Sequence, residues 1–233
     1  MMKDKNILIV GGSSGIGKAL AELLSPSNNL FIASRTADNL THLNVKHIPF
    51  DATTDDLDIS ALPEQLHGFV YCPGSINLRP FKGLGIDAFE SDFQLNVMGA
   101  VKVLKSVLGQ LAASVSSSVV FFSTVAVQTG MPFHSSIAAS KGAIEGLTRS
   151  LAAEFAPKIR VNAIAPSLVD TPLAAKFLNN ETKLEKANER HPLGRVGNAK
   201  EIAQAAAYLL GEESSWMTGK VLQLDGGIGN LKT

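Results

Sequence analysis

The chain has 233 residues, and its 21 lysines and arginines balance 21 aspartates and glutamates, so its net charge is zero when histidine is neutral. This balance favours neither nucleic acid nor an anionic membrane surface as a partner, and we expect neither. Cys72 is the single cysteine, which excludes an internal disulfide and is typical of a reducing cytoplasm. No apolar stretch reaches the roughly 18 residues of a membrane span, so we expect a soluble, cytoplasmic protein.

An apolar run from Asn6 to Val10 predicts the first strand, and the segment GGSSGIGKALAELL follows it directly. Its glycines form the pattern G-x-x-x-G-x-G between that strand and an amphipathic helix. Backbone N–H groups at a helix start, with no side chain in the way, can bind a pyrophosphate. We therefore favour a dinucleotide-binding loop over a purely structural turn, with candidate contacts at Gly11, Ser13, Ser14, Gly15 and Ile16.

The second predicted strand is followed by Ser34 and Arg35. Dinucleotide folds place an acid here when the adenosine ribose has free hydroxyls, and no acid stands at this point. An arginine can instead bind a 2′-phosphate through charge-assisted hydrogen bonds. We predict NADP(H) rather than NAD(H), the alternative being a solvated loop arginine. Asp51 and Ala52 follow the third predicted strand and are further candidates for cofactor contact.

Strands and helices alternate along the whole chain. This alternation predicts an α/β fold, a doubly wound parallel sheet (Rossmann fold) with helices on both faces in three layers. We expect residues 1–233 to form a single domain, in which the long polar segment of about residues 166–195 borders the substrate. The predicted strands are residues 6–10, 30–33, 45–50, 69–72, 119–122, 160–165 and 221–224, and the predicted helices after the first are residues 87–113, 136–155 and 201–210.

The predicted helix 87–113 carries an apolar residue about once per turn, beginning with Phe89, Phe93 and Val97. Asn96 and Gly99 interrupt this helix. Taken alone, a mid-helix asparagine is more often exposed or bonded in the core than catalytic, so its role depends on the motifs around it.

A strand end, a loop and a helix start meet between residues 119 and 152. The apolar strand ends in Ser123 and Thr124, a loop follows, and the next helix carries Lys141 among apolar neighbours. This layout is typical of active sites in α/β proteins. Ile137 stands one helical turn before Lys141, where we would expect an acid–base group.

Together these segments resemble the short-chain dehydrogenase/reductase family. The resemblance covers nearly the whole chain, and several motifs in order at matching spacings are far more specific than any one of them. The matching pieces are VGGSSGIG at 10–17, Asp51, Gly74, LNVMG at 95–99, FSTVA at 122–126, SK at 140–141, VNAIAPSLVDTP at 161–172 and TGKVLQLDGG at 218–227.

The resemblance implies hydride transfer between a nicotinamide ring and a carbonyl or alcohol carbon of a small molecule. By position, the family's catalytic asparagine, serine and lysine correspond to Asn96, Thr124 and Lys141, and the lysine also holds the nicotinamide ribose. Many relatives are tetramers, so we expect a homo-oligomer, with a tetramer favoured. Further cofactor contacts implied by the matching motifs are Gly74, Pro166, Ser167, Val169 and Thr171.

The family's acid–base tyrosine corresponds to Ile137, with no gap in the spacing from Thr124. Isoleucine cannot donate a proton, and loss of a general acid–base group lowers a rate by about 10²–10⁴-fold. His134 is the nearest replacement, because imidazole has a reference pKa of about 6.5 and suits proton transfer at neutral pH. The alternatives are that His134 is a surface loop histidine and that Ser135 and Ser136 order a water donor.

Three functions stay open on the sequence. The first is an NADP(H)-dependent oxidoreductase that reduces a small carbonyl compound with an altered proton donor. The second is a non-catalytic or weakly active NADP(H)-binding protein of the family. The third is reduction of a different bond, such as a carbon–carbon double bond, on the same scaffold. We expect no metal site in any of the three.

Overall fold

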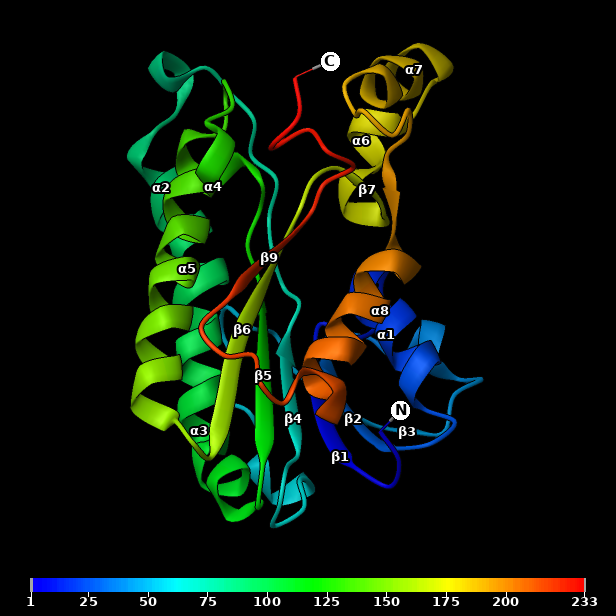
Figure 1. Ribbon diagram of the computed structural model, residues 1–233, viewed down its shortest axis with the longest axis vertical. Helices are drawn as coiled ribbons and strands as arrows, with labels where there is room; N and C mark the ends of the chain where they lie inside the picture. The colour runs from blue at the N-terminus through cyan, green and yellow to red at the C-terminus, as the bar shows by residue number, and fades with distance from the viewer. Residues whose placement is uncertain (1, 233) are drawn as a thin grey trace.

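The computed structural model describes residues 2–232 as a central sheet with helices on both faces (Figure 1). Seven parallel strands form the sheet in the order β3-β2-β1-β4-β5-β6-β9, and β7 pairs with β8 separately. The predicted doubly wound α/β fold is therefore confirmed. The strands are β1 (Asn6–Val10), β2 (Asn29–Ser34), β3 (Val45–Pro49), β4 (Gly68–Tyr71), β5 (Ser117–Phe122), β6 (Ile159–Pro166), β7 (Val169–Asp170), β8 (Gly197–Asn198) and β9 (Val221–Leu224).

Helices α1 and α8 pack together on one face of the sheet, and α2, α3 and α5 cover the other (Figure 1). The helices are α1 (Gly15–Leu24), α2 (Ile86–Phe93), α3 (Gly99–Ala113), α4 (Ala126–Thr129), α5 (Ser135–Phe155), α6 (Ala175–Leu178), α7 (Glu181–Glu189) and α8 (Ala199–Leu210). Short 3₁₀ turns lie at Asp38–Leu40, Ile59–Ala61, Phe81–Gly83, Pro172–Ala174 and Glu212–Ser214.

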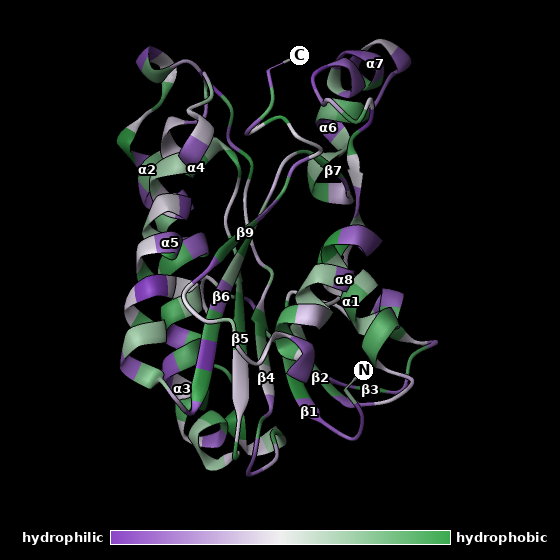
Figure 2. Cartoon of the chain, in the orientation of Figure 1, coloured by the Kyte–Doolittle hydropathy of each residue, from purple (hydrophilic) through white to green (hydrophobic). Residues whose placement is uncertain are grey.

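The central strands have unbroken apolar runs because both of their faces are covered. In β1, Ile7, Leu8 and Ile9 are all fully buried. Their side chains alternate, so that Leu8 packs with the core under α3 and α5 while Ile7 and Ile9 pack with the core under α1 and α8. When the chain is coloured by hydropathy, α7 is mostly hydrophilic (Figure 2). Burial therefore holds the sheet rigidly beneath the loops at its carboxyl edge.

The strand order reverses between β1 and β4, since β2 and β3 lie to one side of β1 and the later strands to the other. At such a switch point the loops after the two central strands diverge and leave a crevice. The glycine loop after β1 and residues 72–75 after β4 border this crevice. The topology thus places the predicted cofactor loop at the usual ligand position of an open α/β sheet.

The predicted helix 87–113 is divided into α2, a π-helical turn at Gln94–Met98, and α3. The 3.6-residue period predicted over this helix breaks at Phe93, which is 42% exposed while the neighbouring Asp92 is 1% exposed. A π-turn contains an extra residue, so a 3.6-residue stripe drawn from α3 does not continue into α2. The interruption buries Asn96.

Two smaller expectations also fail. The loop expected after Thr124 contains α4, and the strand expected to end at Cys72 ends at Tyr71. The remaining strand and helix ends agree with the prediction within two residues. Such differences reflect end fraying and local turns, which hydropathy does not resolve.

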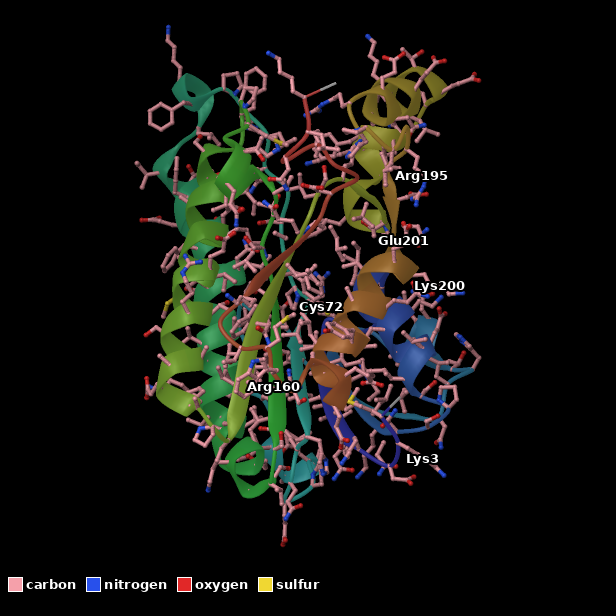
Figure 3. The ribbon with its side chains drawn as sticks, viewed as in Figure 1. Lys3, Cys72, Arg160, Arg195, Lys200 and Glu201 are labelled. Atoms are coloured by element: carbon pink, nitrogen blue, oxygen red, sulfur yellow. The ribbon has the colours of Figure 1, made fainter. Side chains whose placement is uncertain are left out.

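The segment between β6 and α8 contains α6 and α7, and it returns to the body of the protein at Arg195 (Figure 3). Arg195 donates hydrogen bonds to both carboxylate oxygens of Glu201, at 2.9 and 2.5 Å. Glu201 also forms a capping box with Asn198 at the start of α8. This end of the segment is therefore fastened to a helix terminus. No helix in the part of the chain that the structure describes is both long and apolar enough to cross a membrane.

Candidate active site

A groove of about 460 Å³ lies at the carboxyl ends of β1, β2 and β4. It gathers most of the residues that the sequence predicts for dinucleotide binding, although they come from segments far apart in the chain. Those that line it are Gly11, Ser13, Ser14, Gly15, Ile16, Ser34, Arg35, Asp51, Ala52, Gly74 and Thr171.

The glycine loop fits a pyrophosphate. Gly15, the first residue of α1, has φ of +52°, a conformation that residues with a side chain rarely adopt. A Cβ atom at Gly17 would overlap the carbonyl oxygen of Gly11. The loop therefore folds tightly onto the first turn of α1, whose N–H groups have no intrahelical partner and attract anions.

Arg35 lies at the exposed rim of this groove, directly after β2. Asp51 lines the same groove, and its Oδ1 accepts hydrogen bonds from the hydroxyl and the backbone N–H of Thr53, at 2.6 and 2.9 Å. These two bonds, and to a smaller extent the charge of Arg35, hold the pKa of the Asp51 carboxyl below its usual value. Arg35 is exposed, and the residues at the end of β2, Ser34 and Arg35, include no carboxylate.

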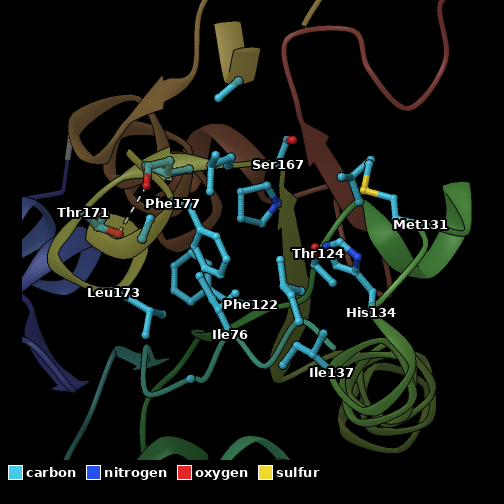
Figure 4. Close-up of a pocket in the computed structure, with 18 of the residues that line it drawn as sticks. Ile76, Phe122, Thr124, Met131, His134, Ile137, Ser167, Thr171, Leu173 and Phe177 are labelled. Atoms are coloured by element: carbon cyan, nitrogen blue, oxygen red, sulfur yellow. Dashed lines mark hydrogen bonds between the residues drawn. The ribbon is translucent and has the colours of Figure 1, made fainter. Parts of the chain in front are cut away.

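A larger cavity of about 650 Å³ is continuous with the groove, because both are lined by Ile16, Cys72, Gly74, Thr171 and Leu173. The predicted residues Thr124, His134, Ile137 and Lys141 line it, as do Pro166, Ser167 and Val169 (Figure 4). Only Asn96, among the predicted catalytic residues, stands behind the wall of the cavity rather than in it. The two spaces together have the shape expected for a cofactor and a substrate bound side by side.

Lys141 is 7% exposed and directs its ammonium toward Gly74. A Cβ atom at Gly74 would lie 3.5 Å from Lys141 Nζ and 3.3 Å from Asn96 Oδ1, so the glycine leaves both polar atoms facing one space. Asn96 Oδ1 is buried and has no hydrogen-bond partner within residues 2–232. A buried acceptor of this kind is normally satisfied by a water or a ligand.

Burial lowers the pKa of Lys141 to about 8, and the neighbouring Cys72 and Asp92 oppose this shift. Burial also raises the pKa of the Cys72 thiol to about 12. The raised pKa keeps the thiol neutral at pH 8. A neutral thiol is a poor nucleophile, so Cys72 offers no activated sulfur to the cavity that it lines.

Asp92 belongs to a buried polar cluster that the sequence did not reveal. Its Oδ1 accepts hydrogen bonds from the hydroxyl of Ser75 at 2.5 Å and the amide of Asn77 at 2.7 Å. The amide of Asn96 donates to Ser75 Oγ at 3.0 Å and to the Asp92 carbonyl at 2.7 Å. The cluster thus fixes the orientation of Asn96 Oδ1. In the sequence, the one signal for this cluster was the acid Asp92, which stands one helical turn before Asn96.

Ile137 is 5% exposed and lines the cavity with Thr124 and His134 (Figure 4). His134 Nδ1 lies 2.7 Å from the carbonyl oxygen of Pro132. A carbonyl only accepts, so Nδ1 carries a proton and Nε2 is left to exchange one. The buried hydroxyls of Ser135 and Ser136 have no partner in the described chain, yet neither residue lines the cavity. Of the expected proton donors, the geometry favours His134.

A second histidine, His191, also lines the cavity and was not anticipated. Its Nδ1 lies 2.7 Å from the carbonyl oxygen of Ala187, and its Nε2 lies 2.9 Å from Ser167 Oγ. Nδ1 donates to the carbonyl, so Nε2 accepts from the serine hydroxyl. The contact joins the end of β6 to α7.

Among the described residues, no group of three or more His, Cys, Asp or Glu side chains is arranged to hold a metal ion.

Comparison with known proteins gives a consistent result. A family profile described as enoyl-(acyl carrier protein) reductase matches residues 11–229. The chain is 32% identical to a 2,5-dichloro-2,5-cyclohexadiene-1,4-diol dehydrogenase of Sphingobium indicum, over 97% of each protein. It is 33% identical to a 3-oxoacyl-(acyl-carrier-protein) reductase of Thermotoga maritima, over 97% of this chain and 98% of the relative.

A solved structure agrees with the sequence relatives. The ligand-free aldohexose dehydrogenase of Thermoplasma acidophilum superposes with a TM-score of 0.88 at 25% identity, covering 99% of this chain and 97% of that one. This chain belongs to the short-chain dehydrogenase/reductase family of oxidoreductases, which use nicotinamide cofactors and act on small molecules.

Proposed function

We propose that the protein is an NADP(H)-dependent oxidoreductase that reduces the carbonyl group of a small molecule and uses a proton donor other than tyrosine. The observation that carries the proposal is the continuity of two spaces. A groove with an intact glycine loop and Arg35 opens into a cavity where Thr124, His134 and Lys141 stand around Ile137.

The residues present fit the cofactor. The first turn of α1 would bind the pyrophosphate, Arg35 the 2′-phosphate, and Lys141 the nicotinamide ribose. Pro166, Ser167, Val169 and Thr171 border the nicotinamide end of the site. When bound, NADPH supplies a hydride, and the chain must supply a proton and orient the substrate.

Two side chains have the chemistry for this second task. The Thr124 hydroxyl can donate a hydrogen bond to the carbonyl oxygen and polarise it. His134, with Nδ1 bound to Pro132, can deliver a proton from Nε2 to the oxygen that becomes the alcohol, and can recover it from solvent. Ile137 keeps the space beside them apolar.

The proposal is tested by NADPH oxidation against a panel of small ketones and aldehydes, alongside a fluorescence titration with NADPH. We expect slow but measurable reduction, and His134→Ala should lower kcat by about 10-fold or more, since general acids contribute about 10²–10⁴-fold. Unchanged kcat in His134→Ala would assign the proton to another donor. Tight NADPH binding with no turnover of any carbonyl would favour a non-catalytic, cofactor-binding role.

Reduction of a carbon–carbon double bond is the second candidate, and the description of the matching family profile favours it. An apolar residue at position 137 suits a reaction that needs no phenol there. A panel of enones in the same assay distinguishes double-bond reduction from carbonyl reduction. A double-bond reductase consumes NADPH with enones but does not reduce a ketone that has no conjugated double bond.

We further infer that the protein assembles as a homo-oligomer, with a tetramer favoured. Apolar side chains are exposed along α2 and its π-turn, with Ile86 at 74%, Phe93 at 42% and Met98 at 45%. Trp216 is fully exposed and packs against nothing in the described chain. Such surface is costly to leave in water. Sedimentation equilibrium at micromolar concentration should report a species larger than the monomer, and a monomer alone would refute the inference.

A further inference from the structure

The mouth of the larger cavity is strongly basic. Four of its lining residues, Lys176, Lys183, Lys186 and Arg190, come from α6, α7 and the residue after α7. All four are exposed. The described residues that line this cavity include no aspartate or glutamate. The substrate space therefore has cations at its entrance and no anion to balance them.

The charge on α7 is divided between two faces. Lys183, Lys186 and Arg190 follow a spacing of three and four residues, which places them on one side of a helix. Ala187 lies among them, and it is buried against the cavity wall. The acids of the same segment, Glu181, Glu185 and Glu189, repeat every four residues and do not line the cavity. The hydrophilic surface of α7 in Figure 2 is thus basic toward the cavity and acidic away from it.

Within residues 2–232 these cations also have no carboxylate partner. Lys176 Nζ donates to the carbonyl oxygen of Ile76 at 2.9 Å, and Lys183 Nζ donates to the carbonyl oxygen of Lys176 at 3.0 Å and to Asn179 Oδ1 at 2.8 Å. No ion pair is formed by any of the four with another side chain of residues 2–232. Neutral acceptors hold two of the ammonium groups in place without cancelling their charge.

Between this mouth and the reacting groups the cavity is apolar. Ile76, Leu173 and Phe177 line it on the side of α6, and Met131 and Ile137 line the opposite part (Figure 4). Thr124 and His134 lie beside Met131 and Ile137. A molecule that matches this sequence of surfaces has a carbonyl at one end, an apolar body, and an anion at the other end.

We propose that the substrate is an oxo compound with an apolar body and a terminal carboxylate or phosphate, and that Lys183, Lys186 and Arg190 bind this anion. The assignment rests on the proposed carbonyl reduction and adds a substrate class to it. Lysine and arginine both bind such groups, arginine in a bidentate manner. Because the cations are exposed, their attraction is screened by salt and adds to substrate affinity rather than to the rate of hydride transfer.

The test uses methyl-ketone carboxylates of increasing chain length, their methyl esters, and a phosphate monoester of a hydroxyketone. In the wild type, kcat/KM should be higher for one of the acids or for the phosphate than for its neutral counterpart, and the difference should shrink as salt is added. The double variant Lys186→Gln/Arg190→Gln should reduce this preference by about 10-fold through KM, with kcat nearly unchanged. The control Lys3→Gln/Lys200→Gln removes the same charge from positions outside the cavity (Figure 3) and should have no effect.

Equal kcat/KM for charged and neutral probes in the wild type would overturn the assignment, as would an unchanged preference in the double variant. A comparable loss of NADPH affinity in the double variant would also overturn it, by assigning the cations to the cofactor. If no probe is reduced although NADPH binds, carbonyl reduction fails as a function. The anion site is then tested by titrating the acid and its ester into the NADPH complex and following cofactor fluorescence. Tighter binding of the acid than of the ester, with this preference lost in the double variant, supports the site. Equal binding of acid and ester refutes it.

Discussion

The groove at β1, β2 and β4 and the cavity at β5 and α5 are built by the same sheet, yet they depart from the family pattern to different degrees. The groove keeps its glycine loop and Arg35. The cavity has Ile137 at the tyrosine position, Thr124 at the serine position, and a Ser167–His191 contact. A cofactor presents fixed chemistry, so its contacts tolerate little change, whereas the substrate side can change with the substrate. We therefore expect cofactor binding and proton transfer to be separable by mutation.

The largest expected effect restores the missing proton donor. In Ile137→Tyr, the phenol would stand one helical turn from Lys141, whose charge lowers the pKa of a neighbouring phenol. Carbonyl reduction should rise by about 100-fold, the lower end of the range for general acid–base catalysis. Steady-state kcat/KM with NADPH measures the change.

Ile137→Phe is the matched control, because it adds the ring without the hydroxyl. A similar gain in Ile137→Phe would mean that shape rather than proton transfer had changed. A brisk wild-type activity that Ile137→Tyr abolishes would contradict carbonyl reduction and favour a reaction that requires the apolar residue.

Arg35→Ala tests the groove alone. A hydrogen bond to a charged group contributes about 1.5–3 kcal/mol, so the Kd for NADPH should rise by roughly 10-fold to 100-fold, while the Kd for NADH should hardly change. Fluorescence titration with both cofactors measures this, and kcat at saturating NADPH should stay near the wild-type value. Equal affinity of the wild-type protein for NADPH and NADH would contradict the preference.

A further effect concerns stability where the two regions meet. The pKa of Lys141 falls from 10.5 to about 8 on folding, so between these values the unfolded chain binds more protons and stability rises with pH. Below pH 8 the cost of burying the ammonium is fully present, at about 3 kcal/mol, since one pKa unit corresponds to about 1.4 kcal/mol.

Lys141→Met should therefore raise the free energy of unfolding at pH 7 by up to about 3 kcal/mol, less what Asp92 loses with its cation, and this gain should shrink as pH rises from 8 to 10.5. Denaturant unfolding at pH 7 and pH 10 measures it, and NADPH affinity should fall in the same variant. A variant that is less stable than wild type at pH 7 would show that the ammonium is well compensated in the folded protein.

Much of the fold could be predicted because its signals are local. Apolar runs such as Asn6–Val10 and the alternation of strands with helices specify a parallel sheet, and the glycine spacing specifies the loop after β1. The periodicity did not predict the exposure of Phe93, which lies directly before a π-turn that changes the helical register. Hydropathy with a fixed period has no means to detect an inserted residue.

The sequence by itself determined the fold class, the family and the absence of a tyrosine at position 137, because each of these is carried by residue identity at known spacing. Only the tertiary structure decided which side chains share a space. It placed His134 in the cavity but left Ser135 and Ser136 outside it, buried Asp92 beside Asn96, and turned one face of α7 toward the cavity. These facts depend on side-chain direction and on contacts between distant segments, which arise only when the two cores form on either side of the sheet.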